Sequence, residues 1–189
     1  MINLIYETFN PEIHDVYQVA KLVYDVDYRT FDIFFKSDEQ AINSISNYLL
    51  KKKLNDYFKV ILDDNRNIIG YVSIYLYGEK HDFNLKSPKL FLVDILDYFV
   101  LCDIEKDDLY LAEIAIDESM RGKGLGRKVV CDVIEYAKSK NFNRVILDTD
   151  FRNKSAKKLY ESIGFKEFNK KRVKILGFER GMYNMEFNL

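Results

Sequence analysis

The 189-residue sequence predicts a single α/β domain in which a mixed sheet is flanked by helices, and three observations support this. Hydrophobic residues make up 48% of the chain, which is enough for one well-buried core and little for two. Only eight Gly and two Pro occur, so long linkers and disordered tracts are not expected. Short β-rich runs alternate with helical stripes along the chain, without an internal repeat.

The first half of the chain predicts a strand, two helices and a hairpin. Alternation of apolar and polar residues indicates the strand, whereas the helices show apolar stripes at three- and four-residue spacing. A polar run over residues 63–67 separates two β-rich segments and has the composition of a hairpin turn. The expected elements are a strand over 2–9, a helix from Pro11 capped by Asn10, an aromatic segment over 28–35, a helix capped by Ser37, and strands over 58–62 and 68–77.

The second half predicts an insert followed by alternating strands and helices. Residues 78–108 form the insert, in which a polar stretch precedes a densely apolar segment, 89–101, that we expect to be helical. Gly164 is placed to end a helix, because glycine readily adopts the left-handed conformation found there. The expected elements after the insert are a strand over 110–116, a helix over 124–140, a strand over 144–149, a helix over 155–163, and an antiparallel pair over 165–175 and 181–189.

Composition and charge narrow the functional classes. The 29 basic and 30 acidic residues give a net charge of −1, so binding driven by the bulk charge of nucleic acid or an anionic membrane is not expected. No apolar run approaches the ~20 residues that span a bilayer, and no signal segment is recognisable. Two cysteines are too few for a disulfide framework, and the apolar helical pattern around Cys131 predicts its burial. We expect a cytoplasmic protein with reduced thiols. His14 and His81 are far apart, so no metal site is expected.

Three of the eight glycines fall within five positions, between the strand ending at Ile116 and the following helix. Glycine lets the backbone turn tightly and approach a ligand, and the N–H groups at a helix start favour an anion. Arg121, Lys123 and Arg127 add positive charge. A pyrophosphate suits such a turn, and a solvated surface loop is the alternative. The spacing excludes a Walker loop, and position 127 lacks the third glycine of the dinucleotide fingerprint.

Two segments together resemble a known family. Arg121-x-x-Gly124-x-Gly126, after a strand, is similar to the Gln/Arg-x-x-Gly-x-Gly/Ala motif of the GCN5-related N-acetyltransferase (GNAT) superfamily. Residues 153–165 resemble the superfamily's Asn-x-x-Ala-x-x-Leu-Tyr-x-x-x-Gly-Phe segment. Both motifs occur in the usual order and at the usual separation. The close match covers residues 110–165, and the insert departs from the minimal pattern.

The resemblance implies a GNAT-like, mostly antiparallel sheet and acetyl-CoA as co-substrate, with no metal. The strand before the turn would pair with the pantetheine amides through Ile114, Ala115 and Ile116. Asn153 would contact the cofactor arm. Tyr160 would protonate the departing thiolate, since a phenol holds its proton more firmly than a thiol; core packing is the alternative role. The residues that would cradle the pyrophosphate are Arg121, Gly122, Lys123, Gly124, Leu125, Gly126 and Arg127.

Two carboxylates are candidates for the general base. A protonated primary amine cannot attack until it loses a proton, and a carboxylate is the usual acceptor of that proton. Glu113 lies among apolar neighbours in the predicted strand, where a carboxylate is unexpected. Asp148 occupies the position where some family members that acetylate protein N-termini carry a Glu. A charge facing solvent or a loop is the alternative for each, and we slightly prefer Glu113.

The sequence does not identify the acceptor amine: a small amine, an antibiotic, an amino acid, a peptide N-terminus and a lysine side chain are all compatible with it. The aromatic segment 28–35 lies in the region that lines the acceptor pocket in this family. Asp25, Asp27 and Asp32 are interleaved with it and could attract a cationic amine, although acids facing water explain them equally well. If exposed, the apolar segment 89–101 could cover the acceptor cleft or form a homodimer contact; burial in the core is the commoner outcome.

The leading hypothesis is therefore an acetyl-CoA-dependent N-acetyltransferase in which the amine attacks the thioester directly. One alternative is a catalytically inactive CoA-binding sensor, and the presence of Tyr160 argues against it. The other is a protein-interaction module that docks a partner through its apolar insert.

Overall fold

The computed structural model describes residues 3–51, 56–78, 91, 95, 98–175 and 178–189. His81 and most of the expected helix over 89–101 lie outside the described residues; residues 98–100 of that segment are helical. None of the described helices is long and apolar enough to cross a membrane.

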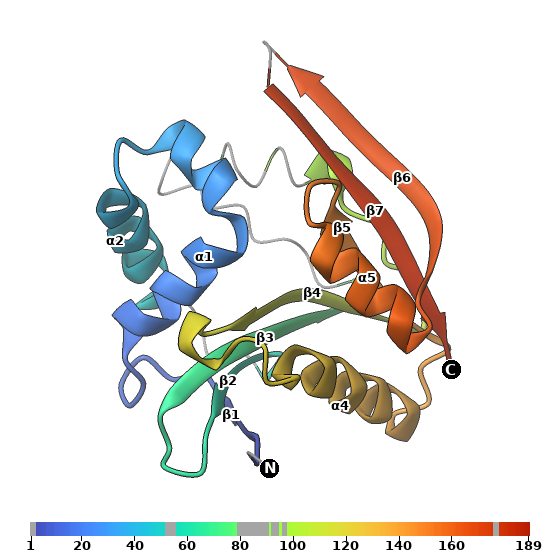
Figure 1. Cartoon of the computed structure of the whole chain (residues 1–189), viewed down its shortest axis with the longest axis horizontal. Helices are drawn as coiled ribbons and strands as arrows, with labels where there is room; N and C mark the ends of the chain where they lie inside the picture. The colour runs from blue at the N-terminus through green and yellow to red at the C-terminus, as the bar shows by residue number, and fades with distance from the viewer. Residues whose placement is uncertain (1–2, 52–55, 79–90, 92–94, 96–97, 176–177) are drawn as a thin grey trace. The chain divides into compact units, whose positions relative to one another are not determined.

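The elements in chain order (Figure 1) are β1 (Ile5–Thr8), α1 (Val16–Phe34), α2 (Asp38–Leu49), β2 (Phe58–Leu62), β3 (Ile68–Leu76), β4 (Asp108–Ile116), the 3₁₀ helix η1 (Glu118–Met120), α4 (Leu125–Ser139), β5 (Arg144–Asp150), α5 (Lys154–Ile163), β6 (Lys166–Ile175) and β7 (Phe178–Asn188).

Seven strands form one sheet in the order β1-β2-β3-β4-β5-β7-β6. Pairing is antiparallel between β1 and β2, β2 and β3, β5 and β7, and β6 and β7. It is parallel between β4 and β5, because α4 forms the crossover connection that parallel neighbours require. The predicted fold class, a mixed and mostly antiparallel sheet with helices, is confirmed.

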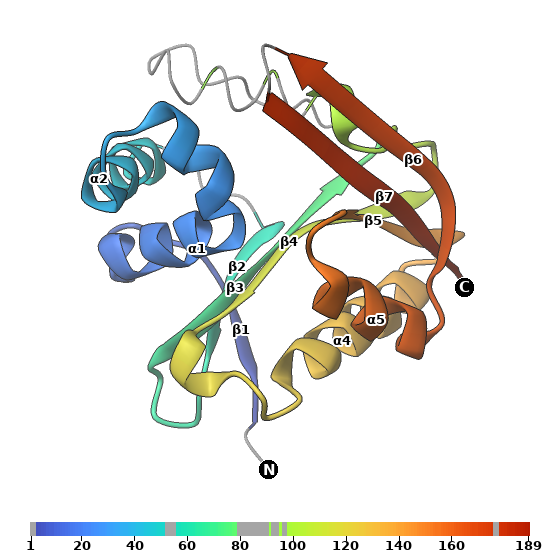
Figure 2. The ribbon, with the colours of Figure 1, turned by 45° about the horizontal axis from the view of Figure 1, so that its top comes forward.

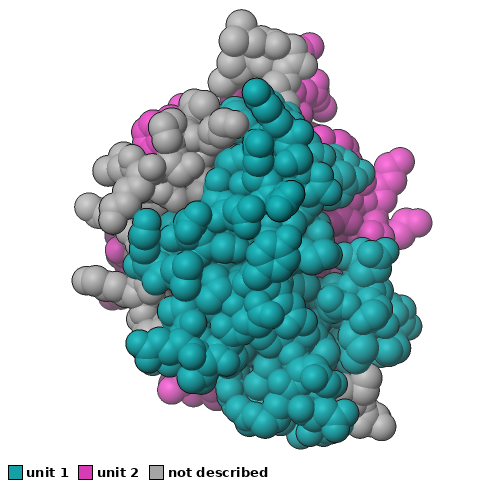
Figure 3. Space-filling model, turned by 90° about the vertical axis from the view of Figure 1, so that its left-hand side faces the viewer, with its two compact units in different colours: residues 1–73, 84–89, 113–126 teal, residues 74–83, 90–112, 127–189 magenta. Residues whose placement is uncertain are grey.

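The chain divides into two compact units, which Figure 3 colours separately. Unit 1 comprises residues 1–73, 84–89 and 113–126, and unit 2 comprises residues 74–83, 90–112 and 127–189. Unit 1 therefore contains β1, β2, α1, α2 and the turn after β4, whereas unit 2 contains β5, β6, β7, α5 and most of α4. Strands β3 and β4 contribute residues to both units.

In unit 1, α1 and α2 pack side by side (Figures 1 and 2). The expected helix start at Pro11 is wrong, because the backbone carbonyl of Asn10 closes a separate turn before the helix. α1 instead begins at Val16, and the carboxylate of Asp15 caps it. Ser37 caps α2 as expected.

α1 is longer than expected and bends at Asp27, which has non-helical dihedral angles (φ −134°, ψ 37°). The Thr30 hydroxyl donates to Asp27 Oδ1 (2.9 Å), a side-chain contact that spans the bend. The aromatic segment 28–35, which we expected between the two helices, forms the second half of α1 as far as Phe34.

Strand β3 approaches the end of β4 closely at Gly70. A Cβ atom at position 70 would lie 2.3 Å from the carbonyl oxygen of Ala115, a distance that no side chain tolerates. The backbone N–H of Asp117 donates to the carbonyl of Ile69 (2.9 Å) directly after β4 ends. Glycine is therefore required at position 70 by the approach of two backbones.

In unit 2, β6 and β7 form a long antiparallel hairpin (Figure 2), and β7 also pairs with β5. Gly164 ends α5 with φ 120°, as expected for a terminating glycine. The expected burial of Cys131 is wrong: Cys131 is exposed, whereas Val129 and Val133 are buried. Position 131 lies between two residues of the buried stripe and therefore on the opposite side of α4.

We expect Gly70→Ala to lower the free energy of unfolding by about 1–3 kcal/mol, since overpacking against a backbone carbonyl forces β3 and β4 apart. Gly181→Ala is the matched comparison, because its Cβ atom would meet side-chain atoms, Cε2 and Cδ2 of Phe151 (2.3 and 2.4 Å), in place of a backbone carbonyl. Urea unfolding should place Gly70→Ala below Gly181→Ala in stability. A Gly70→Ala protein as stable as wild type would contradict the close approach.

Candidate functional site

The turn after β4 contains two glycines in the left-handed region. Gly122 and Gly124 have φ values of 77° and 76°. Chain neighbours aside, no atom of the described residues lies within 4 Å of the Cβ position at either glycine. Other residue types would be strained at these positions. The backbone of the turn is therefore open on the side where side chains would stand, and a ligand can approach its peptide groups.

This turn leads directly into α4. The first N–H groups of an α-helix have no partner within the helix, and the side chain of the preceding residue usually caps them. α4 begins at Leu125, so the capping position falls on Gly124, which has no side chain to offer. The N–H groups and the positive end of the helix dipole at this point are suited to an anion.

Basic side chains accompany the turn. Arg121 is exposed, and its Nε donates to the carbonyl of Ile116 (3.3 Å), which ties the turn to the end of β4. Lys123 is exposed as well. Arg127 donates to the hydroxyl of Ser162 on α5, so this guanidinium also has a structural contact within unit 2.

The residues expected to face the cofactor arm form the last part of β4. β4 pairs with β5 over residues 108–111, and the rest of β4 extends past that ladder. Ala115 is buried, whereas Ile114 and Ile116 are half-buried. The carboxylate of Asp117 caps η1 after the strand, and its hydrogen bonds from Ser119 lower the pKa of Asp117. The strand end and the turn are thus joined by a fixed, capped connection.

Glu113, the preferred candidate base, is half-buried in β4 and contacts a tyrosine of β3. The Tyr71 hydroxyl donates to Glu113 Oε2 (2.8 Å), and Tyr71 itself is fully buried. A phenol that donates to a carboxylate stabilises the charged form of that carboxylate. In the sequence, Tyr71 is only one residue of a β-rich run, although Gly70 beside it is a signal for close backbone approach.

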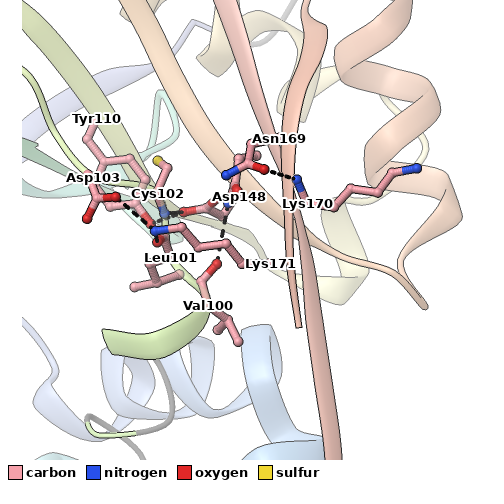
Figure 4. A network of polar contacts seen from close by, with 10 residues as sticks. Val100, Leu101, Cys102, Asp103, Tyr110, Asp148, Asn169, Lys170 and Lys171 are labelled. Atoms are coloured by element: carbon pink, nitrogen blue, oxygen red, sulfur yellow. Dashed lines mark hydrogen bonds and ion pairs between the residues drawn. The ribbon is translucent and has the colours of Figure 1, made fainter. Parts of the chain in front are cut away.

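Asp148, the other candidate base, lies in a polar network of unit 2 (Figure 4). Its Oδ2 accepts hydrogen bonds from the Cys102 N–H (2.9 Å) and the Tyr110 hydroxyl (2.9 Å). Its Oδ1 accepts a hydrogen bond from the Asn184 side-chain amide. Loss of hydration on burial raises the pKa of Asp148, and these donors partly oppose the shift. The Asp148 carboxylate therefore holds together three separate segments, which are the segment before β4, β4 itself and β7.

The same network fixes the segment before β4. Lys171 on β6 donates to the carbonyl of Leu101 (2.7 Å) and pairs with Asp103 (3.0 Å), as Figure 4 shows. Asn184 on β7 donates to the carbonyl of Val100 (3.3 Å). Lys171 and Asn184 were not among the residues predicted from the sequence. The signal for Asn184 was an amide between apolar neighbours in a strand, since a buried polar group requires partners.

Asn153 and Tyr160 both belong to α5. Asn153 caps the helix through Oδ1, which accepts the Ala156 N–H (3.1 Å), so a cofactor contact would use its amide nitrogen. Tyr160 packs edge-on against Phe165, with the ring centroids 5.8 Å apart. Tyr160 is half-buried, and loss of hydration raises its pKa to about 12. The phenol therefore holds its proton at neutral pH, as a proton donor must.

The three acids expected to attract an amine have partners within α1. Asp25, Asp27 and Asp32 interact with Lys21, Thr30 and Tyr24, respectively. These contacts fasten successive turns of the helix, so local pairing accounts for the positions of all three. Among the residues that the structure describes, no group of three or more His, Cys, Asp or Glu side chains could hold a metal ion.

The predicted site residues fall into two sets. Unit 1 holds Glu113, residues 114–116 and the turn from Arg121 to Gly126. Unit 2 holds the remaining candidates, which are Arg127, Asp148, Asn153 and Tyr160.

Comparison with known proteins connects the chain to acetyl transfer. A model of the acetyltransferase (GNAT) family matches residues 20–165. N-acetylaspartate synthetase of Rattus norvegicus is 30% identical over 109 residues, which are 52% of this chain and 36% of the rat protein. N-alpha-acetyltransferase 30 of Xenopus laevis is 41% identical over 56 residues, which are 30% of this chain and 20% of that protein. The chain thus spans from about a fifth to about a third of the length of these relatives.

The fold is also similar to a solved structure, that of a GNAT family acetyltransferase from Elizabethkingia anophelis with acetyl-CoA bound. The TM-score is 0.56 at 18% identity, and the match covers 99% of each chain. At this identity the similarity concerns the fold.

The raised pKa of Asp148 predicts an unusual dependence of stability on pH. A carboxyl group whose pKa is higher in the folded protein than in the unfolded chain binds its proton more tightly in the folded state, so protonation stabilises the fold. Its contribution to stability is therefore largest below the ordinary pKa of 3.8 and declines as the pH rises toward the folded-state value. The free energy of unfolding of wild type relative to Asp148→Asn, measured by urea unfolding, should accordingly fall between acid and neutral pH. If the stability of wild type relative to Asp148→Asn rose with pH instead, the folded protein would not disfavour the charged form of Asp148.

Proposed function

The chain belongs to the GNAT family of acetyltransferases, and from this membership we propose that it transfers the acetyl group of acetyl-CoA to a primary amine. The open turn at Gly122 and Gly124, which enters α4 without a capping side chain, carries the proposal. It fits a pyrophosphate because its backbone is unobstructed, its helix-start N–H groups lack helical partners, and Arg121 and Lys123 are exposed beside it. The fold similarity to a structure with acetyl-CoA bound supports the choice of co-substrate.

Acetyl-CoA would supply an acetyl group activated as a thioester. Residues 121–127 would hold its pyrophosphate, and residues 114–116 with Asn153 would orient its pantetheine arm. Glu113 takes the proton that the acceptor ammonium must lose before its nitrogen can attack. The amine then attacks directly, without transfer of the acetyl group to a protein nucleophile. Tyr160 Oη donates a proton to the departing sulfur and regains one from the nitrogen, which must lose its second proton to become the amide; the raised pKa of this phenol supports the donor role.

We infer that the acceptor nitrogen is an α-amine. Aspartate has a single amine, the α-amine, and one relative is named N-acetylaspartate synthetase. Another is named an N-alpha-acetyltransferase. The test measures thiol release from acetyl-CoA with L-aspartate, with a peptide bearing a free N-terminus, and with an N-acetylated lysine peptide. We expect release with at least one of the first two and none with the third. Binding of acetyl-CoA without release from any amine would favour the CoA-binding sensor instead.

The cofactor assignment predicts that Gly124→Glu abolishes acetyl-CoA binding in calorimetry, because a carboxylate would stand beside the anion site. Gly78→Glu is the matched control. Gly78 also has a positive φ (84°), and the described residues leave its Cβ position equally open, so both variants carry the same kind of backbone strain. Gly78→Glu should keep the wild-type affinity. A folded Gly124→Glu protein that binds acetyl-CoA normally would refute the assignment.

The assignment of Tyr160 predicts that Tyr160→Phe lowers kcat by roughly 10²-fold, the usual span for loss of a general acid. The ring is retained, so the edge-on contact with Phe165 and the fold should survive, which circular dichroism can verify. Rapid-quench measurements must show first that chemistry limits turnover. A Tyr160→Phe enzyme with the wild-type rate of the chemical step would exclude this role.

A further inference from the structure

Two adjacent residues of β3 hold the part of β4 that contains Glu113. Gly70 allows β3 to lie so close to β4 that a Cβ atom there would be 2.3 Å from the Ala115 carbonyl oxygen. The next residue, Tyr71, donates its hydroxyl to Glu113 Oε2 at 2.8 Å. A backbone contact and a side-chain contact thus fix neighbouring residues of β4, and all of these residues belong to unit 1.

The phenol of Tyr71 has little freedom to move. Tyr71 is fully buried, and its ring stacks on Phe58 with the centroids 5.2 Å apart. Phe58 in turn makes an edge contact with Phe9, whose ring lies 5.4 Å away. Packing on this scale fixes a rotamer. The direction of the Tyr71 hydroxyl is therefore set by the aromatic core of unit 1.

A buried hydroxyl aimed at a carboxylate has a definite chemical effect. It stabilises the charged form and so keeps the carboxylate ready to accept a proton at lower pH. Tyr71 is a titratable residue of β3 that contacts Glu113, and the neighbours of Glu113 along β4, Ala112 and Ile114, are uncharged. A phenylalanine would fill the same space in the aromatic stack, so packing alone does not account for the hydroxyl.

We propose that Tyr71 is a positioning residue for acetyl transfer: its hydroxyl orients the Glu113 carboxylate and holds it in the charged form that accepts the proton of the acceptor amine. This rests on the proposed function, in which Glu113 is the general base. Tyr71 acts through Glu113 and does not itself contact the reacting atoms.

The first experiment needs no acceptor. Protein labelled with ¹³C at the glutamate carboxyl is titrated by NMR, and the Glu113 signal is assigned by its loss in Glu113→Gln. In Tyr71→Phe we expect the titration midpoint of Glu113 to move to higher pH by about one unit, the effect of losing one hydrogen bond to a charged group. Tyr110→Phe, which removes the equally buried hydroxyl on Asp148, should leave the Glu113 midpoint unchanged. An unmoved midpoint in Tyr71→Phe would overturn the proposal.

The second experiment compares kcat/KM of Tyr71→Phe and wild type from pH 4.5 to 9, with the best acceptor of the amine panel. The ratio cancels the titration of the amine itself. We expect near-equal values at high pH and a deficit that grows toward the acid end, to about two- to fivefold at pH 4.5, because a one-unit shift reaches its full tenfold effect only below the wild-type midpoint of Glu113. In the Glu113→Gln background, adding Tyr71→Phe should cause no further loss, because Tyr71 acts through Glu113.

The possible failures are distinguishable. A deficit that is the same at every pH, or that persists in the Glu113→Gln background, would assign Tyr71 a purely structural role and overturn the proposal. A pH-dependent deficit in Tyr110→Phe instead would transfer the base function to Asp148 and overturn it too. Absence of acetyl transfer by the wild type to every amine would refute the proposed function, while the NMR titration would still decide the Tyr71–Glu113 interaction.

Discussion

The candidate site in unit 1 depends on the contact between the backbones of β3 and β4 at Gly70. Because no side chain separates them, the Ala115 carbonyl lies against β3, and the end of β4 cannot shift without a change in β3 itself. The hydrogen bond from Asp117 to Ile69 prolongs this contact past the end of the strand. The turn at Gly122 and Gly124 therefore starts from a fixed point, and its open backbone is presented by a rigid support rather than by a free loop.

In the proposed function, recognition at this turn relies on the backbone, and this would explain the composition of the turn. Peptide N–H groups can reach a ligand only where Cβ atoms are missing or point away, so Gly122 and Gly124 are needed both for their positive φ and for the space around them. The missing cap of α4 belongs to the same arrangement: a capping side chain at position 124 would satisfy N–H groups that an anion could otherwise bind. If the turn binds a phosphate as proposed, the missing cap lowers the local stability of the helix and at the same time leaves its N–H groups available to the anion.

Elements with strong local signals were predictable from the sequence, whereas contacts between distant residues were not. The limits of β2 and the cap of α2 follow from β-branched runs and from Ser37, and the structure confirms both. The start and the kink of α1 escaped prediction because Asp15 and Asp27 are both good caps and only tertiary packing decides between them and Asn10. In the candidate site, the glycine turn had a local motif, but the Tyr71–Glu113 contact joins residues 42 positions apart and left no pattern in either segment.

The surroundings of the two carboxylates favour Glu113 over Asp148 as a proton acceptor. A general base must exist in both protonation states without rearranging its neighbours. Asp148 accepts from the Cys102 N–H, and a backbone N–H cannot become an acceptor when the carboxylate gains a proton. If that oxygen took the proton, the donors around it would oppose one another and the segment held by Asp148 would have to move. The Tyr71 hydroxyl can rotate, so it donates to charged Glu113 and can accept from the protonated acid without displacement of its ring. Under the proposed function, the same chemical pair, a buried tyrosine on a carboxylate, would serve proton exchange at Glu113, whereas at Asp148 it serves structural attachment.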